Sequence, residues 1–243
     1  MTTLIVGASG ATGMNLVEQL LSRGQNVKIV VRSIEKLPES WKNNKQLQII
    51  SASILELSDK EMMELASDCH SIASCLGHNM NWKGIYGRPR KLVTDATHRL
   101  CDAIKANNPK SPVKFVLMNT TGNSNRDLYE PISLGQKCVI RLLRLILPPH
   151  VDNENAADYL RTTIGQNQQF IEWTAIRPDN LINEEELTDY EIHPSPIRSA
   201  IFDTGKTSRI NVGHFMANLI FDNDLWNRWK GQMPVIYNKS SLN

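Results

Sequence analysis

Hydrophobic residues along the chain occur in two patterns, short continuous runs and longer stretches with an apolar residue every three or four positions. The first is typical of strands buried on both faces and the second of helices that cover a sheet. Runs at 3–6, 27–31, 47–50, 71–76, 114–118 and 173–176 predict strands, and helical spacing at 11–23, 58–66, 90–107 and 134–147 predicts helices. This alternation predicts an α/β fold, a Rossmann-type doubly wound parallel sheet.

The sequence GASGATG follows the first predicted strand and leads directly into the first predicted helix. In such a unit Gly7 allows the sharp turn, Gly10 lets backbone N–H groups approach a pyrophosphate, and Gly13 lets the helix pack closely on the strand. The helix N-terminus and two hydroxyl side chains add donors for phosphate. We therefore predict a dinucleotide site, the alternative being a structural turn, with cofactor contacts at Gly7, Ser9, Gly10, Ala11, Thr12 and Gly13.

The end of the second predicted strand distinguishes between cofactors. In an NAD site an acidic residue there binds the ribose 2′-hydroxyl, but the chain has no acidic residue between Glu18 and Glu35. Arg32 occupies this position, where a guanidinium can hold a 2′-phosphate. We expect NADP(H) as the cofactor, with a solvated surface arginine as the alternative.

The residues that follow the other strands should lie near the same ligand, because the carboxyl ends of parallel strands meet at one edge of the sheet. We include as candidate cofactor-binding residues Cys75, Leu76, Gly77, Thr120, Thr121 and Pro178. We expect a single domain over 1–243, with a nucleotide-binding core at 1–125 and a C-terminal part at 126–243 that carries a small substrate-side lobe.

Composition excludes several classes of function. The net charge of +2 does not suggest a nucleic-acid surface, and no apolar stretch is long enough for a transmembrane segment. The first strand begins at residue 3, which leaves no room for a signal peptide, so we expect a cytoplasmic protein. The four cysteines lack both CxxC pairs and zinc spacing, so we expect mostly buried, reduced thiols, no disulfide and no metal site.

Several motifs together resemble the atypical branch of the short-chain dehydrogenase/reductase superfamily, which contains NmrA-like proteins and biliverdin IXβ/flavin reductases. They are GASGATG, Val31-Arg32, 74–77, 120–122, 158–161, 173–178 and, for the flavin reductase type, 209–216. The classical branch would have glycine at position 11, which is Ala11 here. The chain departs from the family at Ala52-Ser53, where Gly-Asp is usual, and at Asp179 or Asn180, where the flavin reductase has its active-site histidine.

The resemblance also directs attention to the catalytic groups of the superfamily. Thr120 stands where related enzymes place a hydroxyl near the nicotinamide, so it is the candidate catalytic residue, the alternative being a hydroxyl that caps its own turn. Catalytic members pair a tyrosine with a lysine four residues later. Here Tyr86, Tyr129, Tyr159, Tyr190 and Tyr237 are followed at that distance by Arg90, Ser133, Thr163, Pro194 and Ser241.

Without this dyad, an enzyme can still transfer hydride to a conjugated acceptor that takes its proton from water, as flavins and linear tetrapyrroles do. We therefore expect an NADPH-dependent reductase of a flavin-like or other conjugated acceptor. The alternative is a non-catalytic, NmrA-like protein that senses NADP(H). An isomerase or dehydratase with bound cofactor is a third, less favoured class.

Two further segments bear on partners. Loop 78–90 combines glycines, aromatics and a basic cluster, which suggests a lid over an anionic, aromatic small molecule; a solvated loop is the alternative, and His78 could contact ligand. The stretch 134–147 carries a basic stripe of Lys137, Arg141 and Arg144 among leucines, and Pro148-Pro149 should end it. We expect a buried helix with a charged outer face; a protein partner or oligomer interface and an interfacial membrane helix are alternatives.

Overall fold

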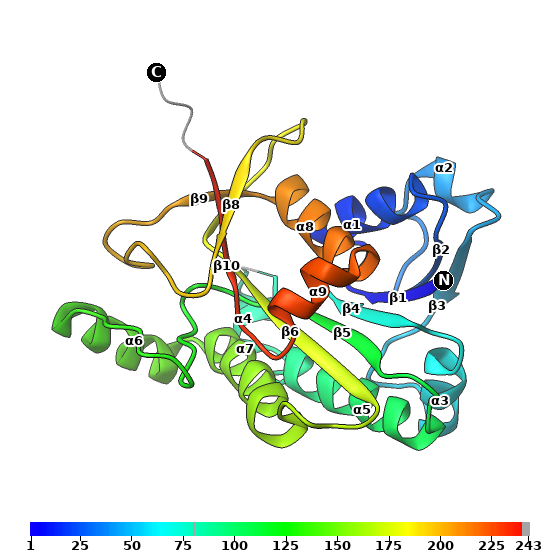
Figure 1. Ribbon diagram of the computed structural model, residues 1–243, viewed down its shortest axis with the longest axis horizontal. Coiled ribbons are helices and arrows are strands. Elements are labelled where there is room, and N and C mark those ends of the chain that lie inside the picture. The colour runs from blue at the N-terminus through cyan, green and yellow to red at the C-terminus, as the bar shows by residue number, and fades with distance from the viewer. Residues whose placement is uncertain (80, 240–243) are drawn as a thin grey trace.

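The computed structural model describes residues 1–79 and 81–239, which fold around one large sheet (Figure 1). Its strands are β1 (Thr2–Val6), β2 (Asn26–Val31), β3 (Leu47–Ser51), β4 (Ser71–Ser74), β5 (Val113–Met118), β6 (Ile171–Pro178), β8 (Tyr190–His193) and β10 (Val235–Asn238). Their order is β3-β2-β1-β4-β5-β6-β10-β8, and only the β10–β8 pair is antiparallel. Two short strands, β7 (Asn180–Ile182) and β9 (Lys206–Ser208), form a separate parallel pair. The predicted Rossmann-type doubly wound sheet is confirmed.

Helices cover both faces of the sheet (Figure 1). They are α1 (Ala11–Leu21), α2 (Glu39–Lys42), α3 (Asp59–Ala66), α4 (Trp82–Tyr86), α5 (Leu92–Asn107), α6 (Leu134–Ile146), α7 (Pro148–Tyr159), α8 (Arg209–Phe221) and α9 (Asn223–Trp229), and a π-helical turn, Leu160–Ile164, extends α7. Side chains of β1 alternate between two cores, with Leu4 and Val6 facing α3, α5 and α7 and Ile5 facing α1, α8 and α9. Burial on both faces explains why the strands appear in the sequence as continuous apolar runs.

Local sequence signals account for the start of two helices. Ser58 and Glu61 form the reciprocal hydrogen bonds of a capping box at the start of α3. Pro148 and Pro149 end α6, as predicted, but they also open α7, which the periodicity did not reveal. Proline is favoured in the first turn of a helix, because its missing N–H would have no intrahelical partner there.

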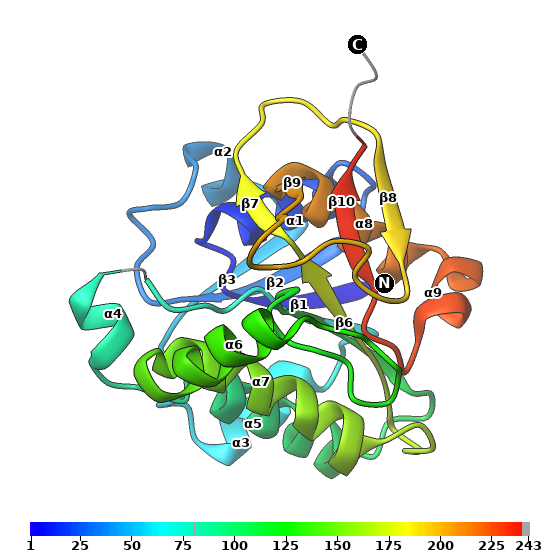
Figure 2. The ribbon, with the colours of Figure 1, turned by 90° about the vertical axis from the view of Figure 1, so that its left-hand side faces the viewer.

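The prediction that the segment 134–147 is a buried helix is wrong. Of the residues of α6, only Gln136 and Ile140 are buried, whereas Leu134, Leu142 and Leu145 are 80%, 54% and 83% exposed. Figures 1 and 2 show the reason, since α6 lies at the left-hand margin in Figure 1 and faces the viewer beside α7 in Figure 2, and so does not cover a face of the sheet. Only its inner side therefore has a surface to pack on. The partner-binding and membrane alternatives for its outer side stay predictions.

The structure gives two further facts on organisation. Strand β5 pairs with β6, so one sheet joins the segments 1–125 and 126–243, and the division between them stays a prediction. No helix in the described part of the chain combines the length and the apolar character needed to cross a bilayer.

Candidate functional site

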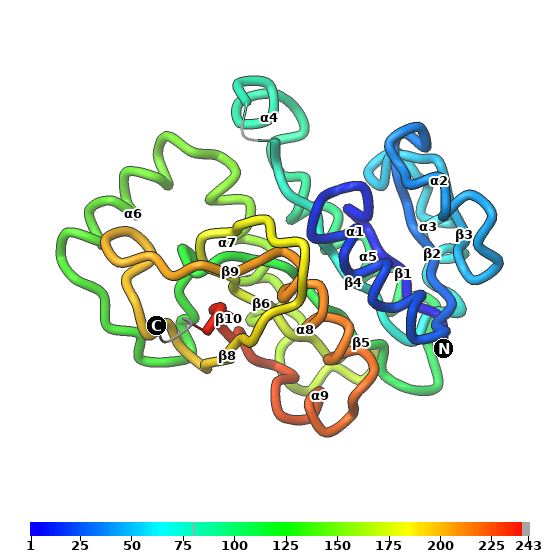
Figure 3. Tube along the Cα trace, turned by 90° about the horizontal axis from the view of Figure 1, so that it is seen from above, coloured from blue at the N-terminus to red at the C-terminus, as the bar shows by residue number. Residues whose placement is uncertain are grey.

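The order of the strands reverses between β1 and β4, because the chain leaves β1 toward β2 on one side and later returns to β4 on the other. In open parallel sheets, ligands bind at the carboxyl ends of the strands at such a switch point. The residues that follow β1, β2, β4, β5 and β6 all lie at this edge. In the view from above, α4 and its loop project beyond the sheet and α6 lies at its margin (Figure 3).

The geometry of the turn explains in a different way why each of the three positions is a glycine. Gly7 has φ of +80°, and a Cβ there would lie 2.5 Å from the carbonyl carbon of Cys75. A Cβ on Gly13 would lie 2.2 Å from the Gly7 oxygen. Gly10 is exposed, and a Cβ there would meet only the Gly7 oxygen, at 3.3 Å.

Gly10 is also the N-cap of α1, which has no side-chain cap and therefore leaves its first N–H groups free of a side-chain acceptor. Free backbone donors at a helix start, next to a glycine whose missing side chain leaves space, fit a pyrophosphate. Around Gly10, Ser9 and Ala11 are exposed and Thr12 is buried. Binding of the cofactor by these residues stays a prediction.

Arg32 directly follows β2, the strand that pairs with β1 in the sheet. Its side chain is exposed, and it makes no hydrogen bond or ion pair within residues 1–79 and 81–239. The neighbouring Glu35 is instead bonded to the Ser33 hydroxyl. Arg32 is thus available to an anion such as a 2′-phosphate.

The segment after β4 contributes through its backbone. Burial raises the pKa of the Cys75 thiol to about 12, and its Sγ lies 3.8 Å from the sulfur of Met216. A thiol in this state is not reactive. The Cys75–Leu76 peptide packs against Gly7, whereas Gly77 is exposed and has no atom within 4 Å of where a Cβ would lie.

The segments at the ends of β5 and β6 are joined by hydrogen bonds. The Thr121 N–H donates to the Pro178 oxygen at 3.1 Å, and the Thr121 hydroxyl donates to Asp179 at 3.2 Å. Burial raises the pKa of the Asp179 carboxyl. The Thr120 hydroxyl accepts from the N–H of Gly122 at 3.2 Å, so it does cap its own turn. Its proton is still available to a ligand.

A cavity of about 280 Å³ opens beside this tied pair of strand ends. It is lined by residues 120–122 after β5, by Asp179 and Asn180 after β6, by His150 of α7, by the inner side of α6, and by Ala200, Ile201 and Thr204. The lining includes no tyrosine.

The five tyrosines all lie elsewhere, which agrees with the absence of a Tyr–Lys dyad in the sequence. Tyr86 and Tyr129 are exposed, and Tyr159 stacks on His98 with ring centres 3.7 Å apart. Tyr190 is hydrogen-bonded to Nδ1 of His214 at 2.8 Å, so both side chains are used in packing between β8 and α8.

Sequence reasoning missed His150 and Glu154, which lie one helical turn apart at the start of α7. His150 Nε2 lies 3.5 Å from Glu154 Oε1, and Arg144 of α6 donates to both oxygens of Glu154 at 2.8 and 2.9 Å. These hydrogen bonds outweigh the effect of burial and lower the pKa of Glu154 to about 2. A His-x-x-x-Glu spacing directly after a Pro-Pro helix start was the available signal.

His78 does not reach into the cavity. Its Nε2 lies 2.7 Å from Asp152, its Nδ1 lies 3.2 Å from the Gly84 oxygen, and its side chain is 4% exposed. Asp152 also accepts from the N–H groups of Val93 and Thr94 at the start of α5. His78 is therefore an anchor for loop 78–90, in which residue 80 lies outside the described residues. The function of this loop as a lid stays a prediction.

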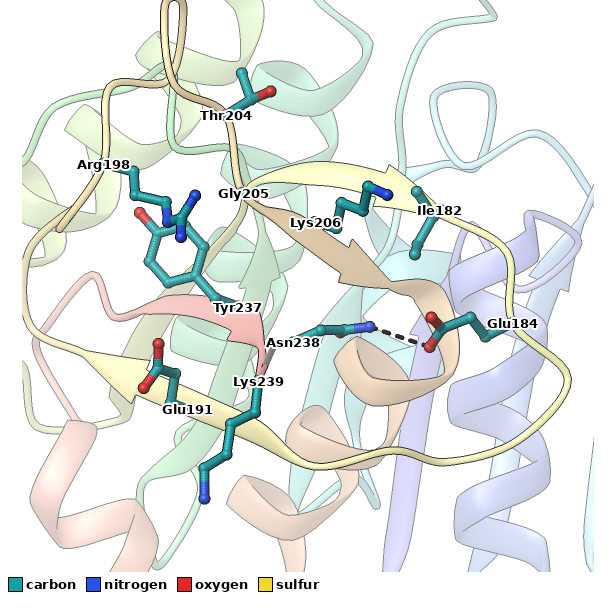
Figure 4. A pocket seen from close by; sticks show the side chains of 10 residues that line it. All are labelled: Ile182, Glu184, Glu191, Arg198, Thr204, Gly205, Lys206, Tyr237, Asn238 and Lys239. Carbon is teal, nitrogen blue, oxygen red and sulfur yellow. Dashed lines mark hydrogen bonds between the residues drawn. The ribbon is translucent and has the colours of Figure 1, made fainter. Parts of the chain in front are cut away.

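A second hollow, of about 440 Å³, lies beyond Gly205 (Figure 4). A Cβ on Gly205 would lie 2.5 Å from the Tyr237 ring, so this close packing requires glycine. The lining mixes Glu184 and Glu191 with three basic side chains, and Asn238 donates to Glu184 at 3.0 Å. None of the predicted cofactor-binding residues is among the described residues that line it, and the cofactor site at the strand ends stays a prediction.

Comparison with known proteins shows the family to which the chain belongs. Residues 7–223 match a family model described as NAD(P)H-binding. A chloroplastic protein of Arabidopsis thaliana, named as uncharacterized, is 30% identical over 193 residues, which are 78% of this chain and 62% of that protein. This chain thus spans about three fifths of that relative's length.

Solved structures share the fold. A short-chain dehydrogenase/reductase of Veillonella parvula in complex with NADP has a TM-score of 0.71 at 15% identity, covering 100% of this chain and 96% of its own. A proposed NADH-flavin reductase of Streptococcus pneumoniae has a TM-score of 0.66 at 14% identity, covering 98% of this chain and 100% of its own.

Proposed function

This chain belongs to the NAD(P)H-binding family and is similar to atypical short-chain dehydrogenases/reductases, and from this premise we propose that it is an NADP(H)-dependent reductase of a flavin-like or other conjugated acceptor. The observation that carries the proposal is the 280 Å³ cavity next to Thr120, at the ends of β5 and β6 and on the same edge of the sheet as the glycine turn that follows β1. An acceptor in this cavity would lie beside a nicotinamide bound at the switch point.

The residues at the strand ends fit the cofactor. The open space at Gly10 and the free amides of α1 suit the pyrophosphate, and the unpartnered Arg32 suits a 2′-phosphate. The bound dinucleotide would supply the hydride. The chain would orient the acceptor through the Thr120 hydroxyl and exclude water with the inner side of α6.

The class of acceptor follows from the missing tyrosine. A simple ketone becomes an alkoxide on reduction and needs a well-placed acid, which typically contributes a factor of about 10²–10⁴. A conjugated acceptor spreads the negative charge over its own π-system. The named function of the Streptococcus pneumoniae neighbour lends support to this class.

A panel of acceptors tests the proposal. The purified chain should oxidise NADPH in the presence of riboflavin, menadione or a linear tetrapyrrole, and should not interconvert secondary alcohols and simple ketones. Tight NADPH binding without turnover of any acceptor would replace the proposal with an NADP(H)-sensing protein. Efficient oxidation of a secondary alcohol would contradict both.

A further inference from the structure

His150 is a buried side chain that can transfer a proton, and it is not one of the predicted nucleotide-binding residues. It is 8% exposed, lines the cavity beside Thr120, and its Nε2 makes no hydrogen bond. A buried imidazole whose ring nitrogen is not held by a hydrogen bond of ordinary geometry calls for an explanation beyond packing.

The two edges of the imidazole face different surroundings. The Nε2 edge faces the Glu154 carboxylate at 3.5 Å. The opposite edge faces Gly122, where Cε1 and Nδ1 lie 3.6 and 3.8 Å from the position that a Cβ would take. Because residue 122 has no side chain, this edge borders the cavity and not another residue.

Glu154 suits the task of holding the ring. Its side chain is 7% exposed, and Arg144 fixes both of its oxygens from α6. A fixed carboxylate beside one ring nitrogen orients the ring and stabilises its positively charged form. The other nitrogen is then free to donate.

We propose that His150 is the proton donor of the reductase, acting from Nδ1 on a carbonyl oxygen or ring nitrogen of the acceptor, and that Glu154 is its positioning residue. This inference rests on the proposed function. NADPH gives a hydride to the π-system of the acceptor (a ring nitrogen in a flavin), the Nδ1–H bond breaks, and the proton neutralises the anion that results by forming an O–H or N–H bond of the reduced acceptor. The products are NADP⁺, the reduced acceptor and neutral His150, which regains its proton from water.

The acceptor is still a conjugated compound, as in the proposed function, because its π-system carries the charge that the hydride brings, and His150 adds the proton that the oxygen of a quinone or conjugated carbonyl compound must gain. Charged and titratable groups near His150 come from three elements: Glu154 on α7, Arg144 on α6, and Asp179 after β6. Glu154 stays ionised throughout the neutral range, because its pKa is about 2. The charge of this carboxylate beside the ring is therefore constant over the pH range in which the rate is measured.

The first experiment uses NADPH and menadione. The substitution His150→Gln should lower kcat about 100-fold while the KM values for NADPH and menadione change less than about twofold. The wild-type rate should fall as the pH rises through the neutral range, and this fall should be absent from the variant. Glu154→Gln should keep a pH-dependent rate, displaced to lower pH. His98→Gln, a histidine stacked on Tyr159 in the interior, is the matched control and should change neither.

The second experiment does not depend on turnover. Diethyl pyrocarbonate should modify His150 more slowly when NADP⁺ and menadione are both present, as followed by mass spectrometry of the peptide that contains it. The same addition should not protect the exposed His70. If wild-type protein reduces no acceptor, the proposed function fails, whereas equal kcat and equal pH profiles of wild type and His150→Gln overturn the proton donor alone. Absence of protection by the two ligands also overturns it. If His150→Gln folds poorly, the variant His150→Ala is used in its place, and added imidazole should restore its activity. Failure of imidazole to restore the activity would contradict the proposal.

Discussion

Arg32 differs from the other arginines near the strand ends in its lack of a protein partner. Arg177 is fully buried and forms an ion pair with Glu130 at 2.6 Å, and Arg144 is held by Glu154. Those two arginines join segments of the fold. Arg32 is exposed and, within the described residues, binds nothing, so its substitution should leave folding unchanged and report on ligand alone.

Replacement of Arg32 by alanine should weaken NADPH binding by roughly 10- to 100-fold, since a lost charge-assisted hydrogen bond costs about 1.5–3 kcal/mol. Binding of NADH should not change, because NADH has no 2′-phosphate. Titration calorimetry with both cofactors measures the difference. The exposed Lys36 in the same loop is the control, and Lys36→Ala should have little effect. Equal affinities of the wild type for NADPH and NADH would refute the NADP assignment.

The β1–turn–α1 unit combines packing and binding within a few residues. Gly7 and Gly13 are fixed by backbone atoms at 2.5 and 2.2 Å from where a Cβ would lie, so the approach of helix to strand depends on them. Gly10 has φ of −81° and ψ of 155°, which any residue can adopt. The same motif therefore contains positions that folding requires and one that folding does not.

Gly10→Val should fold and lose NADPH, because valine tolerates the backbone angles of Gly10 while its methyl groups fill the space over the α1 amides. Circular dichroism and the melting temperature should stay near wild type, and cofactor affinity should fall by more than about 100-fold. Gly13→Val is the matched control and should fail to fold, since its side chain would overlap the Gly7 oxygen. Normal NADPH binding by Gly10→Val would mean that the turn is only structural.

The molecule as a whole is held together at its ligand edge by contacts between distant segments. Asp152 of α7 is hydrogen-bonded to His78 and to a backbone N–H at the start of α5. Glu154 of α7 accepts a hydrogen bond from Arg144 of α6. Both carboxyls have a lowered pKa because of these hydrogen bonds, although burial acts in the opposite direction. Stability toward acid should therefore depend on α7.

The ionised Glu154 should stabilise the folded state at pH values above 4.5, which is its pKa in the unfolded chain. This contribution should be lost as the pH falls toward its pKa in the folded state, about 2. The sign follows from the lowered pKa, because the folded state binds the proton more weakly than the unfolded state. Urea unfolding should show wild type losing on the order of 3 kcal/mol across this window through this group. Glu154→Gln should be less stable at pH 6 and lose less stability on acidification. Glu64→Gln, at a side chain that is 67% exposed, should behave like wild type, and identical pH curves for Glu154→Gln and wild type would refute the assignment.

The sequence by itself determined the elements of the sheet and the order of the motifs on it. The apolar runs around Ile5 and Ile29 and the glycine spacing at 7–13 are patterns that extend over only a few residues, so they could be recognised in the sequence. Tertiary structure alone decided that α6 lies at an edge, that His78 is anchored by Asp152, and that His150 meets the turn at Gly122. These contacts join residues that are distant in the sequence, and their surroundings exist only after α7 has packed against α5 and the strand ends. Local patterns record which side of an element is apolar, whereas the partner that covers this side is set by the packing of the whole chain.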